Sequence, residues 1–322
     1  MASMIRLPPL PTIRDLIKLH NLSASKQLSQ NFLLNSNITN KIVLLDGGVE
    51  NHQVCEVGAG PGCLTRSIIA GGASKIVAVE KDRRFLPALD ILANAVDGRM
   101  VIVYADILNY EMIKAFDPVD KKAWNDESPK MKIIGNLPFS ISTPLLIQWL
   151  NLISQNAGPF SLGRIKMTLT FQEEVAQRIL AEPKTSQRSR LSIMTQNYCH
   201  VKPGFLIKGS SFVPAPKVNS VVLTFTPRIT PLIDIDFTTL EVIAKSLFRH
   251  RRKFVIKGTK YLFPTDVDLS LKLFEEADVD WKLRPQQLTT EEIQRLCAAY
   301  KKVLLDHQLD LSDAMIVKET NK

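Results

Sequence analysis

The chain of 322 residues is 45% hydrophobic, which is enough for a sizeable core and for more than one minimal domain. Its 41 Lys and Arg residues exceed its 32 Asp and Glu residues, and the net charge of +9 favours a polyanionic partner. The four cysteines show no CxxC pair and no metal-ligand spacing, and no apolar run reaches the length of a transmembrane helix. The composition therefore predicts reduced thiols, no metal site and no membrane span.

The N-terminal segment, residues 1–27, is basic and poor in acids, with Asp15 as its one acidic residue. Apolar residues at helical spacing predict an amphipathic helix, which is typical of a mitochondrial presequence. An ordinary N-terminal helix packed on the rest of the protein fits the composition equally well. A further helix is expected to begin near Asn35-Ser36, because both residues are good N-caps.

Four apolar runs predict the strands of an open α/β sheet, and each ends at a glycine or a polar residue. The carboxyl ends of such strands line one edge of a sheet, and ligands bind in the crevice there. The residues after these runs are therefore expected to form the functional site. The runs are Gln53–Val57, Lys75–Val79, Met100–Tyr104 and Lys132–Gly135.

A glycine-rich turn follows the first strand, with Gly58, Gly60 and Gly62 leading into an expected helix over residues 64–69. Glycine lets a ligand approach the backbone closely, and the first N–H groups of the helix face that ligand. A tight turn without a ligand would have the same sequence. Glu80 favours a binding role, because a carboxylate about twenty residues further on accepts both hydroxyls of a ribose. Nicotinamide- and S-adenosylmethionine-binding folds share this pattern.

Asp106 closes the third strand. A carboxylate only accepts hydrogen bonds, so it suits the exocyclic amine of an adenine. The alternative is that it caps the following turn.

The fourth strand leads into Asn136-Leu137-Pro138-Phe139, which suggests chemistry at an adenine N6 amine. The Asn136 oxygen and the carbonyl beside Pro138 are placed to accept the two N–H groups and to favour positive charge on the nitrogen. Phe139 is suited to stack on an extruded base and to favour a cation through its ring face. A proline-containing turn with a buried aromatic is the alternative interpretation.

Beyond this motif the chain continues the sheet. A polar surface segment over residues 117–130 precedes the Asn136–Phe139 motif. After the motif, a helix is expected to begin at Thr143-Pro144, and residues 183–190 form a basic loop. Lys184, Arg188 and Arg190 of this loop are candidates for RNA contact or simply for solvation. The remaining predicted elements are a strand at Lys166–Phe171, a helix at Gln172–Leu180 and a closing antiparallel strand pair, Val201–Ile207 and Val218–Thr226.

A domain boundary is expected between Pro227 and Ile235, where two prolines interrupt the pattern. Helices are predicted at Phe237–Phe248, Asp268–Ala277 and Thr290–Leu305, and the tail after Asp306 is expected to be poorly ordered. The first of these helices ends in a basic run that is suited to phosphate contact, although such a run is often only a solvated face. The run contains Arg249, Arg251, Arg252 and Lys253.

The order and spacing of these motifs resemble the KsgA-type rRNA adenine N6,N6-dimethyltransferases, and most closely their mitochondrial branch, the mitochondrial transcription factor B1 group. The resemblance covers roughly residues 6–300 and is specific because the motifs fall in the family's order. The matching pieces are Gln30-Asn31-Phe32-Leu33, residues 56–62, residues 79–82, Asp106-Ile107, Asn136–Phe139 with residues 142–144, residues 213–218 and residues 248–253.

The resemblance implies a Rossmann-like methyltransferase sheet, mostly parallel with one antiparallel strand, and a small C-terminal all-α domain. It places the methyltransferase domain at residues 28–228, an RNA-binding helical domain at 233–306 and a flexible tail at 307–322. The implied catalytic residues are Asn136, Leu137, Pro138 and Phe139. The implied contacts to S-adenosylmethionine are Gln30, Asn31, Leu33, Gly58, Gly60, Glu80, Lys81, Asp106, Ile107 and Asn136.

The implied activity is dimethylation of N6 on two adjacent adenosines in the 3′-terminal hairpin of mitochondrial small-subunit rRNA. The expected enzyme is a monomer that acts on the assembling small subunit in the mitochondrial matrix. One rival is a mitochondrial transcription factor, a partner of the transcription machinery with secondary or no methylation. Another rival methylates protein glutamine or DNA adenine, but such sites carry Pro-Pro where Leu137-Pro138 stands here.

Overall fold

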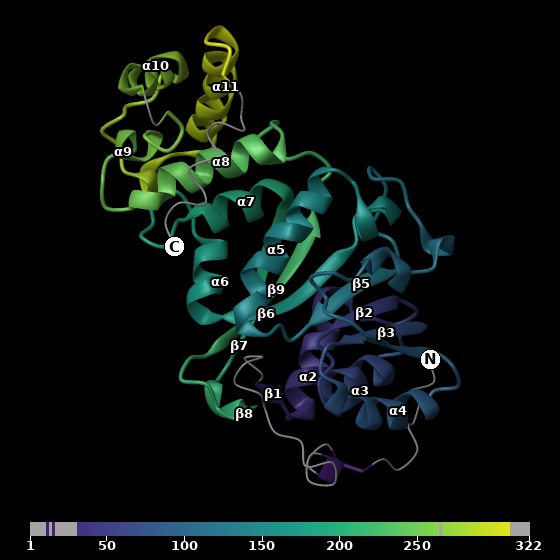
Figure 1. Ribbon diagram of the computed structural model, residues 1–322. Helices are drawn as coiled ribbons and strands as arrows, with labels where there is room; N and C mark the ends of the chain where they lie inside the picture. Colours follow the sequence, from purple (N-terminus) through teal and green to yellow (C-terminus); the bar gives the residue numbers. More distant parts are fainter. Residues whose placement is uncertain (1–10, 13–14, 17–30, 264–265, 310–322) are drawn as a thin grey trace. The chain divides into compact units, whose positions relative to one another are not determined.

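The computed structural model describes residues 11–12, 15–16, 31–263 and 266–309 (Figure 1). The chain divides into two compact units. Unit 1 comprises Met1–Ala176 and His200–Ile229, and unit 2 comprises Gln177–Cys199 and Thr230–Lys322. The segment Gln177–Cys199, which lies within the range expected for the methyltransferase domain, therefore groups with the C-terminal helices.

A seven-stranded sheet forms the centre of unit 1, with the strand order β4-β3-β2-β5-β6-β9-β7 (Figure 1). The first five strands pair in parallel, and β9 pairs with β6 antiparallel. The predicted strands and the mixed, mostly parallel sheet are confirmed, with bounds that shift by a residue or two. The strands are β2 Gln53–Val57, β3 Lys75–Glu80, β4 Met100–Tyr104, β5 Met131–Gly135, β6 Lys166–Gln172, β7 Cys199–Ile207 and β9 Ser220–Pro227.

The strand order reverses between β2 and β5, so this pair marks the switch point of the sheet. Val57 at the end of β2 lies opposite both Val79 of β3 and Gly135 of β5. The segments that follow these strands consequently emerge side by side at one edge, which is where open α/β sheets bind ligands.

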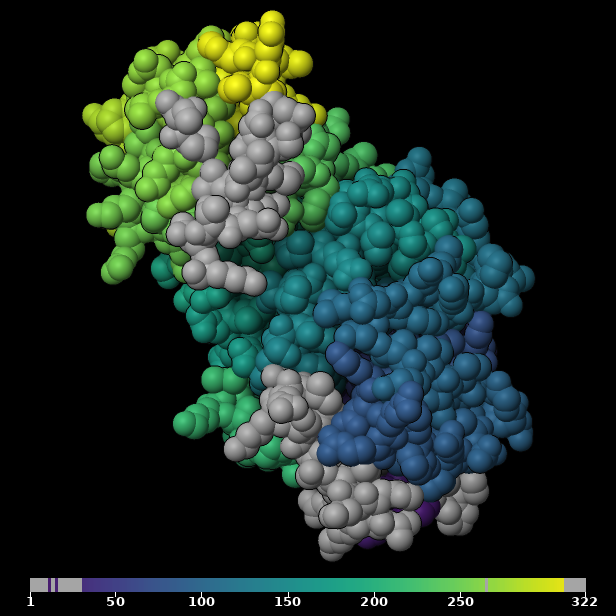
Figure 2. All heavy atoms as spheres, in the orientation of Figure 1, coloured from purple at the N-terminus to yellow at the C-terminus, as the bar shows by residue number. Residues whose placement is uncertain are grey.

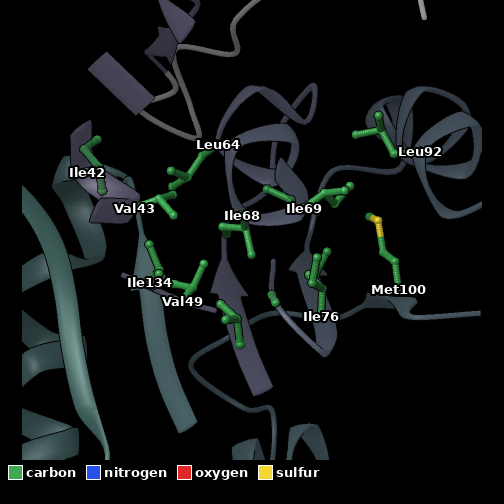
Figure 3. Close-up of a cluster of buried hydrophobic side chains, with 14 of the residues drawn as sticks. Ile42, Val43, Val49, Leu64, Ile68, Ile69, Ile76, Leu92, Met100 and Ile134 are labelled. Carbon is green, nitrogen blue, oxygen red and sulfur yellow. The ribbon is translucent and has the colours of Figure 1, made fainter. Parts of the chain in front are cut away.

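Three helices cover one face of the sheet: α2 Ser36–Leu44, α3 Cys63–Ala70 and α4 Leu86–Asn94. Figure 3 shows how Ile42 and Val43 of α2 and Ile68 and Ile69 of α3 meet Ile76 and Ile134 of the sheet. Each of these side chains is almost fully buried. Burial of such a side chain stabilises the fold by about 1.5–3 kcal/mol, and truncation of one to alanine costs about 2–5 kcal/mol. As expected, Asn35 caps α2 by accepting from the Asn37 N–H at 3.0 Å.

The helix after β5, α5 Phe139–Ser154, begins earlier than the sequence predicts. Proline is favoured in the first turn, so the sequence placed the start at Thr143-Pro144. Instead the Pro138 carbonyl accepts from the N–H groups of Ile141 and Ser142 at 3.1 Å each, and Pro144 lies inside the helix. Pro144 has no N–H, so the carbonyl of Ser140 lacks its helical hydrogen bond. Ser140 is exposed, and water can donate to this carbonyl instead. Phe139 is therefore the first residue of a helix.

A small two-stranded sheet, β1 Phe32–Leu33 with β8 Phe212–Val213, was not predicted. It joins two parts of the chain that are far apart in sequence, and its register pairs Phe32 with Val213 and Leu33 with Phe212.

Unit 2 is helical, and its three predicted helices are confirmed: α8 Phe237–Leu247, α10 Val267–Ala277 and α11 Thr290–Asp306. The atoms of these helices, green to yellow in Figure 2, form a closely packed body. At the start of α11, Thr289 and Glu292 bond to each other's backbone N–H groups, which is a capping box. Two helices of this unit were not predicted, α7 Arg190–Tyr198 and α9 Ile256–Thr259, while the predicted α6 Glu173–Leu180 is confirmed.

Part of the basic N-terminal segment packs on unit 1. Leu16 is fully buried in a cluster with Cys63 and Ala88, and the Arg66 guanidinium donates to the Pro11 carbonyl at 2.7 Å. Apart from residues 11–12 and 15–16, the segment of residues 1–27 lies outside the described residues, as do Gln30 and most of the predicted tail. Among the helices that the structure does describe, none is long and apolar enough to cross a membrane.

Candidate active site

A cavity of about 240 Å³ lies in unit 1 at the carboxyl edge of the sheet. Every unit 1 residue that the sequence predicted for the site lines this cavity, apart from Gln30, which lies outside the described residues. The predicted residues on its walls are Asn31, Leu33, Gly58, Gly60, Glu80, Lys81, Asp106, Ile107, Asn136, Leu137, Pro138 and Phe139.

The structure adds residues that sequence reasoning missed. Phe212 of β8 reaches the cavity because β8 pairs with β1, a long-range contact with no local signal. Ser140 and Ile141 line it because α5 begins at Phe139.

The glycine turn needs its glycines. Gly58, Gly60 and Gly62 have φ values of +72°, +53° and +87°, a region that side chains disfavour. At Gly62 a Cβ atom would also lie 2.6 Å from a methyl group of Leu92. The turn therefore brings bare backbone to the cavity wall and starts α3 beside it.

Glu80 is buried at the end of β3, and its two carboxylate oxygens are held by backbone N–H groups. Gly60 donates to Oε2 and Asp82 donates to Oε1, each at 2.8 Å. Burial raises the pKa of Glu80, and the backbone hydrogen bonds oppose the rise. The two backbone hydrogen bonds fix the carboxylate before any ligand binds. Each oxygen still has a lone pair that can accept from a ligand hydroxyl.

Asp106 differs from Glu80 because it is partly exposed and ion-paired. The Lys81 ammonium donates to its Oδ2 at 2.6 Å, and the Leu108 N–H donates to Oδ1 at 3.1 Å. The hydrogen bond from Lys81 lowers the pKa of Asp106 below its usual range. Asp106 therefore caps the next turn and also lines the cavity, so the two interpretations of this residue are compatible.

Asn136 follows the last residue of β5, and both ends of its amide are engaged. Its Nδ2 donates to the Asn31 carbonyl at 3.2 Å, and its Oδ1 accepts from the Thr170 hydroxyl at 2.8 Å. Leu137 is buried and anchors the loop, while Pro138 caps α5 through its carbonyl. Sequence reasoning missed Thr170, which lies on the neighbouring strand β6.

The cavity combines apolar walls with hydrogen-bond acceptors and offers no activated nucleophile. Cys63 lines it, but burial raises the pKa of this thiol to about 11, so it remains protonated. Within the described residues no three His, Cys, Asp or Glu side chains gather as a metal site requires. The residues of this cavity can therefore bind and orient a ligand through hydrogen bonds and apolar contacts.

The sheet is Rossmann-like, with carboxylates at the ends of β3 and β4 and with the Asn-Leu-Pro-Phe motif after β5 at the switch point. Together with the family match that follows, these features place the chain among the S-adenosylmethionine-dependent methyltransferases. The sequence pattern of the family described as "Ribosomal RNA adenine dimethylase" matches residues 21–301. The chain belongs to this family, and it is an rRNA adenine dimethyltransferase.

Relatives from several animals extend over most of the chain. The chain is 50% identical to "Dimethyladenosine transferase 1, mitochondrial" of Xenopus tropicalis, over 92% of this chain and 87% of that protein. It is 48% identical to the protein of the same name from Homo sapiens, over 94% of this chain and 88% of the relative.

Two solved structures share the fold. A dimethyladenosine transferase from Plasmodium falciparum matches 84% of this chain and 97% of its own, with a TM-score of 0.62 at 22% identity. The 23S rRNA methyltransferase ErmE matches 84% of this chain and 100% of its own, with a TM-score of 0.56 at 21% identity. At these identities the two structures support the fold alone.

The cavity fits S-adenosylmethionine, the methyl donor of this family. The backbone at Gly58 and Gly60 is free of side chains, and Glu80 presents two fixed acceptor oxygens. The cofactor supplies a methyl group on a positively charged sulfur.

The predicted RNA-contacting residues lie in unit 2, and the structure divides them into two groups. The first group holds the unit together. The buried Arg188 guanidinium donates to the Ala181 carbonyl at 3.1 Å and to Gln196 Oε1 at 3.3 Å. Arg190 forms an ion pair with Glu241 at 3.5 Å.

Arg251 also belongs to the first group, because it links the basic run to the loop at residues 183–190. Its guanidinium donates to the Ser186 carbonyl, and to the Arg188 carbonyl at 3.3 Å. The loop and the run, which are far apart in sequence, are therefore neighbours within unit 2.

The second group is exposed. Lys184, Arg252 and Lys253 extend into solvent, and the Arg249 guanidinium lies 3.9 Å from the centre of the Tyr261 ring. We name Lys184, Arg249, Arg252 and Lys253 the basic face of unit 2.

Proposed function

We propose that this protein dimethylates N6 of two adjacent adenosines in the 3′-terminal hairpin of mitochondrial small-subunit rRNA. It would act on the assembling small subunit in the mitochondrial matrix. Family membership, the names of the relatives and the basic N-terminal segment support this proposal. The observation that carries the adenine chemistry is the position of the Asn136–Phe139 motif at the switch point, on the wall of the same cavity as Glu80.

On the cofactor side, the residues bind and orient. Glu80 accepts the ribose hydroxyls through the lone pairs that Gly60 and Asp82 leave free. Asp106 accepts from the adenine amine of the cofactor, and the glycine turn allows the closest backbone approach. Asn31 and Leu33 cover the methionine end.

On the acceptor side, Asn136 Oδ1 and the Leu137 carbonyl accept the two N–H groups of the target amine. This placement aims the nitrogen lone pair at the methyl group and stabilises the positive charge that develops on attack. Bound S-adenosylmethionine would supply the methyl group, and the methylated amine would release its extra proton to water. No general base is needed for the attack.

Phe139, the first residue of α5, stacks on the target base. The base must leave its helical stack, at a cost of a few kcal/mol. Stacking on the ring offsets part of this cost, and the face of the ring favours the cationic nitrogen.

RNA recognition rests on the basic face of unit 2, within the proposed helical domain at residues 233–306 and the adjoining loop. Lys184, Arg249, Arg252 and Lys253 contact phosphates, so recognition depends on RNA shape and backbone charge. Arg188, Arg190 and Arg251 support this face from within the unit.

The test is to incubate purified protein and S-adenosylmethionine with unmodified small subunits or with the isolated hairpin RNA. Nucleoside mass spectrometry then measures N6,N6-dimethyladenosine. We expect product with the wild type and, over the same reaction time, at most about 1% as much with Asn136→Ala. Cofactor binding without product on either substrate would overturn the proposal and favour a binding protein of the transcription machinery.

A further inference from the structure

We infer that Thr170 is a positioning residue for methyl transfer, because its hydroxyl group fixes the orientation of the Asn136 amide. The inference rests on the proposed role of Asn136 as the acceptor of the target amine. Thr170 itself does not line the cavity, so it acts through Asn136.

The position of Thr170 follows from the sheet. Gly135, the last residue of β5, lies opposite Leu169 of β6. The next residue after Gly135 is Asn136, just beyond β5, and the next residue after Leu169 is Thr170, still on β6. Thr170 is 1% exposed, and its Oγ1 lies 2.8 Å from Asn136 Oδ1. The hydroxyl is thus held by the sheet, while the amide it contacts projects from a loop.

The two partners of Asn136 have different functions. The Asn31 carbonyl can only accept, so it requires the NH₂ end of the amide on its side, where Nδ2 lies at 3.2 Å. A hydroxyl both donates and accepts, so Thr170 does not choose which end faces it. Thr170 instead fixes the plane of the amide by holding the oxygen end.

This restraint matters because the terminal torsion of asparagine has broad, roughly two-fold minima and little preference of its own. With the amide held at both ends, one lone pair of Oδ1 remains for the target amine. If the amide turned over, its NH₂ group would face the amine, and two donors would oppose each other. A shift of about 1 Å in such a group lowers a rate by about 100-fold.

The same strand provides a matched control. Thr168 lies two residues before Thr170, on the same face of β6, and is 3% exposed. Its neighbour on β5 is Ile134 of the core rather than Asn136. Thr168→Val therefore tests the loss of a buried threonine hydroxyl from β6 without touching the amide.

The experiment compares Thr170→Val, Thr170→Ser and Thr168→Val with the wild type. Single-turnover methylation of hairpin RNA gives the rate, and calorimetry gives Kd for S-adenosylmethionine and for RNA. For Thr170→Val we expect a rate lower by about 10- to 100-fold, with both Kd values within about twofold of wild type. Thr170→Ser, which keeps the hydroxyl, should restore the rate to within about threefold, and Thr168→Val should match the wild type.

A wild-type rate in Thr170→Val would overturn the inference. So would a Kd for S-adenosylmethionine that rises as much as the rate falls, or an equal loss of rate in Thr168→Val, because either result indicates general disruption. If the wild-type protein itself leaves the hairpin adenosines unmethylated, the proposed function fails, and the inference fails with it for a different and recognisable reason.

Discussion

The cavity of unit 1 and the basic face of unit 2 hold their polar groups in opposite ways. In the cavity, Glu80 and Asn136 are fixed by hydrogen bonds before any ligand arrives. On the basic face, Arg252 and Lys253 have no ion-pair partner in the described part of the chain and extend into solvent. Fixed groups suit chemistry, where small displacements are costly, and exposed charges suit contact with a polyanion. Substitutions in the cavity should therefore change the methylation rate or cofactor binding by large factors. Substitutions on the basic face should weaken RNA binding by smaller factors.

The largest effect is expected from Asn136→Ala. Loss of one preorganised polar group in an active site lowers kcat by about 100- to 1,000-fold. Single-turnover methylation measures the rate, and Asn151→Ala on α5, away from the cavity, is the control. A rate within threefold of wild type would show that the amide is not part of the chemistry.

Glu80→Gln should weaken the binding of S-adenosylmethionine by about 10- to 100-fold, because charged hydrogen bonds are lost and the new NH₂ group opposes a backbone N–H. Titration calorimetry measures this Kd, and the exposed Glu50→Gln is the control. Binding of RNA should not change. An unaltered Kd would show that the fixed carboxylate of Glu80 does not bind the cofactor. The contrast between the cavity and the basic face would then fail.

Glu56 of β2, just before the glycine turn, should make the stability of the protein depend on pH. It is fully buried, and burial raises its pKa to about 8, with Glu80 adding to the rise and Thr65 opposing it. The folded chain therefore holds a proton that the unfolded chain releases above its ordinary pKa of 4.5, so stability falls as pH rises from about 4.5 to about 8. In Glu56→Gln, the decrease in the free energy of unfolding between pH 5 and pH 8 should be smaller than in the wild type by at least about 1 kcal/mol. Urea denaturation at both pH values measures the free energy of unfolding. An equal decrease in the wild type and in Glu56→Gln would show that Glu56 does not have a raised pKa in the folded protein.

The smallest effect is expected from removing the unpaired charges of the basic face. The double variant Arg252→Ala, Lys253→Ala should weaken RNA binding by about 3- to 30-fold and reduce the slope of log K against log salt by about 1–2. Filter binding at several salt concentrations measures both. The control is Lys302→Ala, since Lys302 is exposed but ion-paired with Glu276 at 2.6 Å. An unchanged slope would remove these residues from the RNA surface.

The sequence predicted the parts of the molecule that local pattern determines. Each strand from β2 to β5 is an apolar run that ends at a glycine or a polar residue, and those ends define the cavity. The start of α5 was wrong because the preference of proline for a first helical turn is a tendency, and Pro144 lies deeper in the helix.

The rest depends on contacts between distant residues. Arg188 has the composition of an RNA contact, yet the loop folds its guanidinium inward onto Gln196 and a backbone carbonyl. Phe212 reaches the cavity only through the pairing of β8 with β1, and Thr170 reaches Asn136 only through the register of β6 with β5. Neither the charge of a residue nor its immediate neighbours in sequence reports such contacts.

The pairing of β1 with β8 has a consequence for the order in which the site is completed during synthesis. The glycine turn, Glu80, Asp106 and Asn136 all lie within the first half of the chain. One wall of the cavity, however, combines Phe32 and Leu33 with Phe212. A nascent chain therefore has the polar groups of its site long before Phe212 of β8 can complete this wall of the cavity.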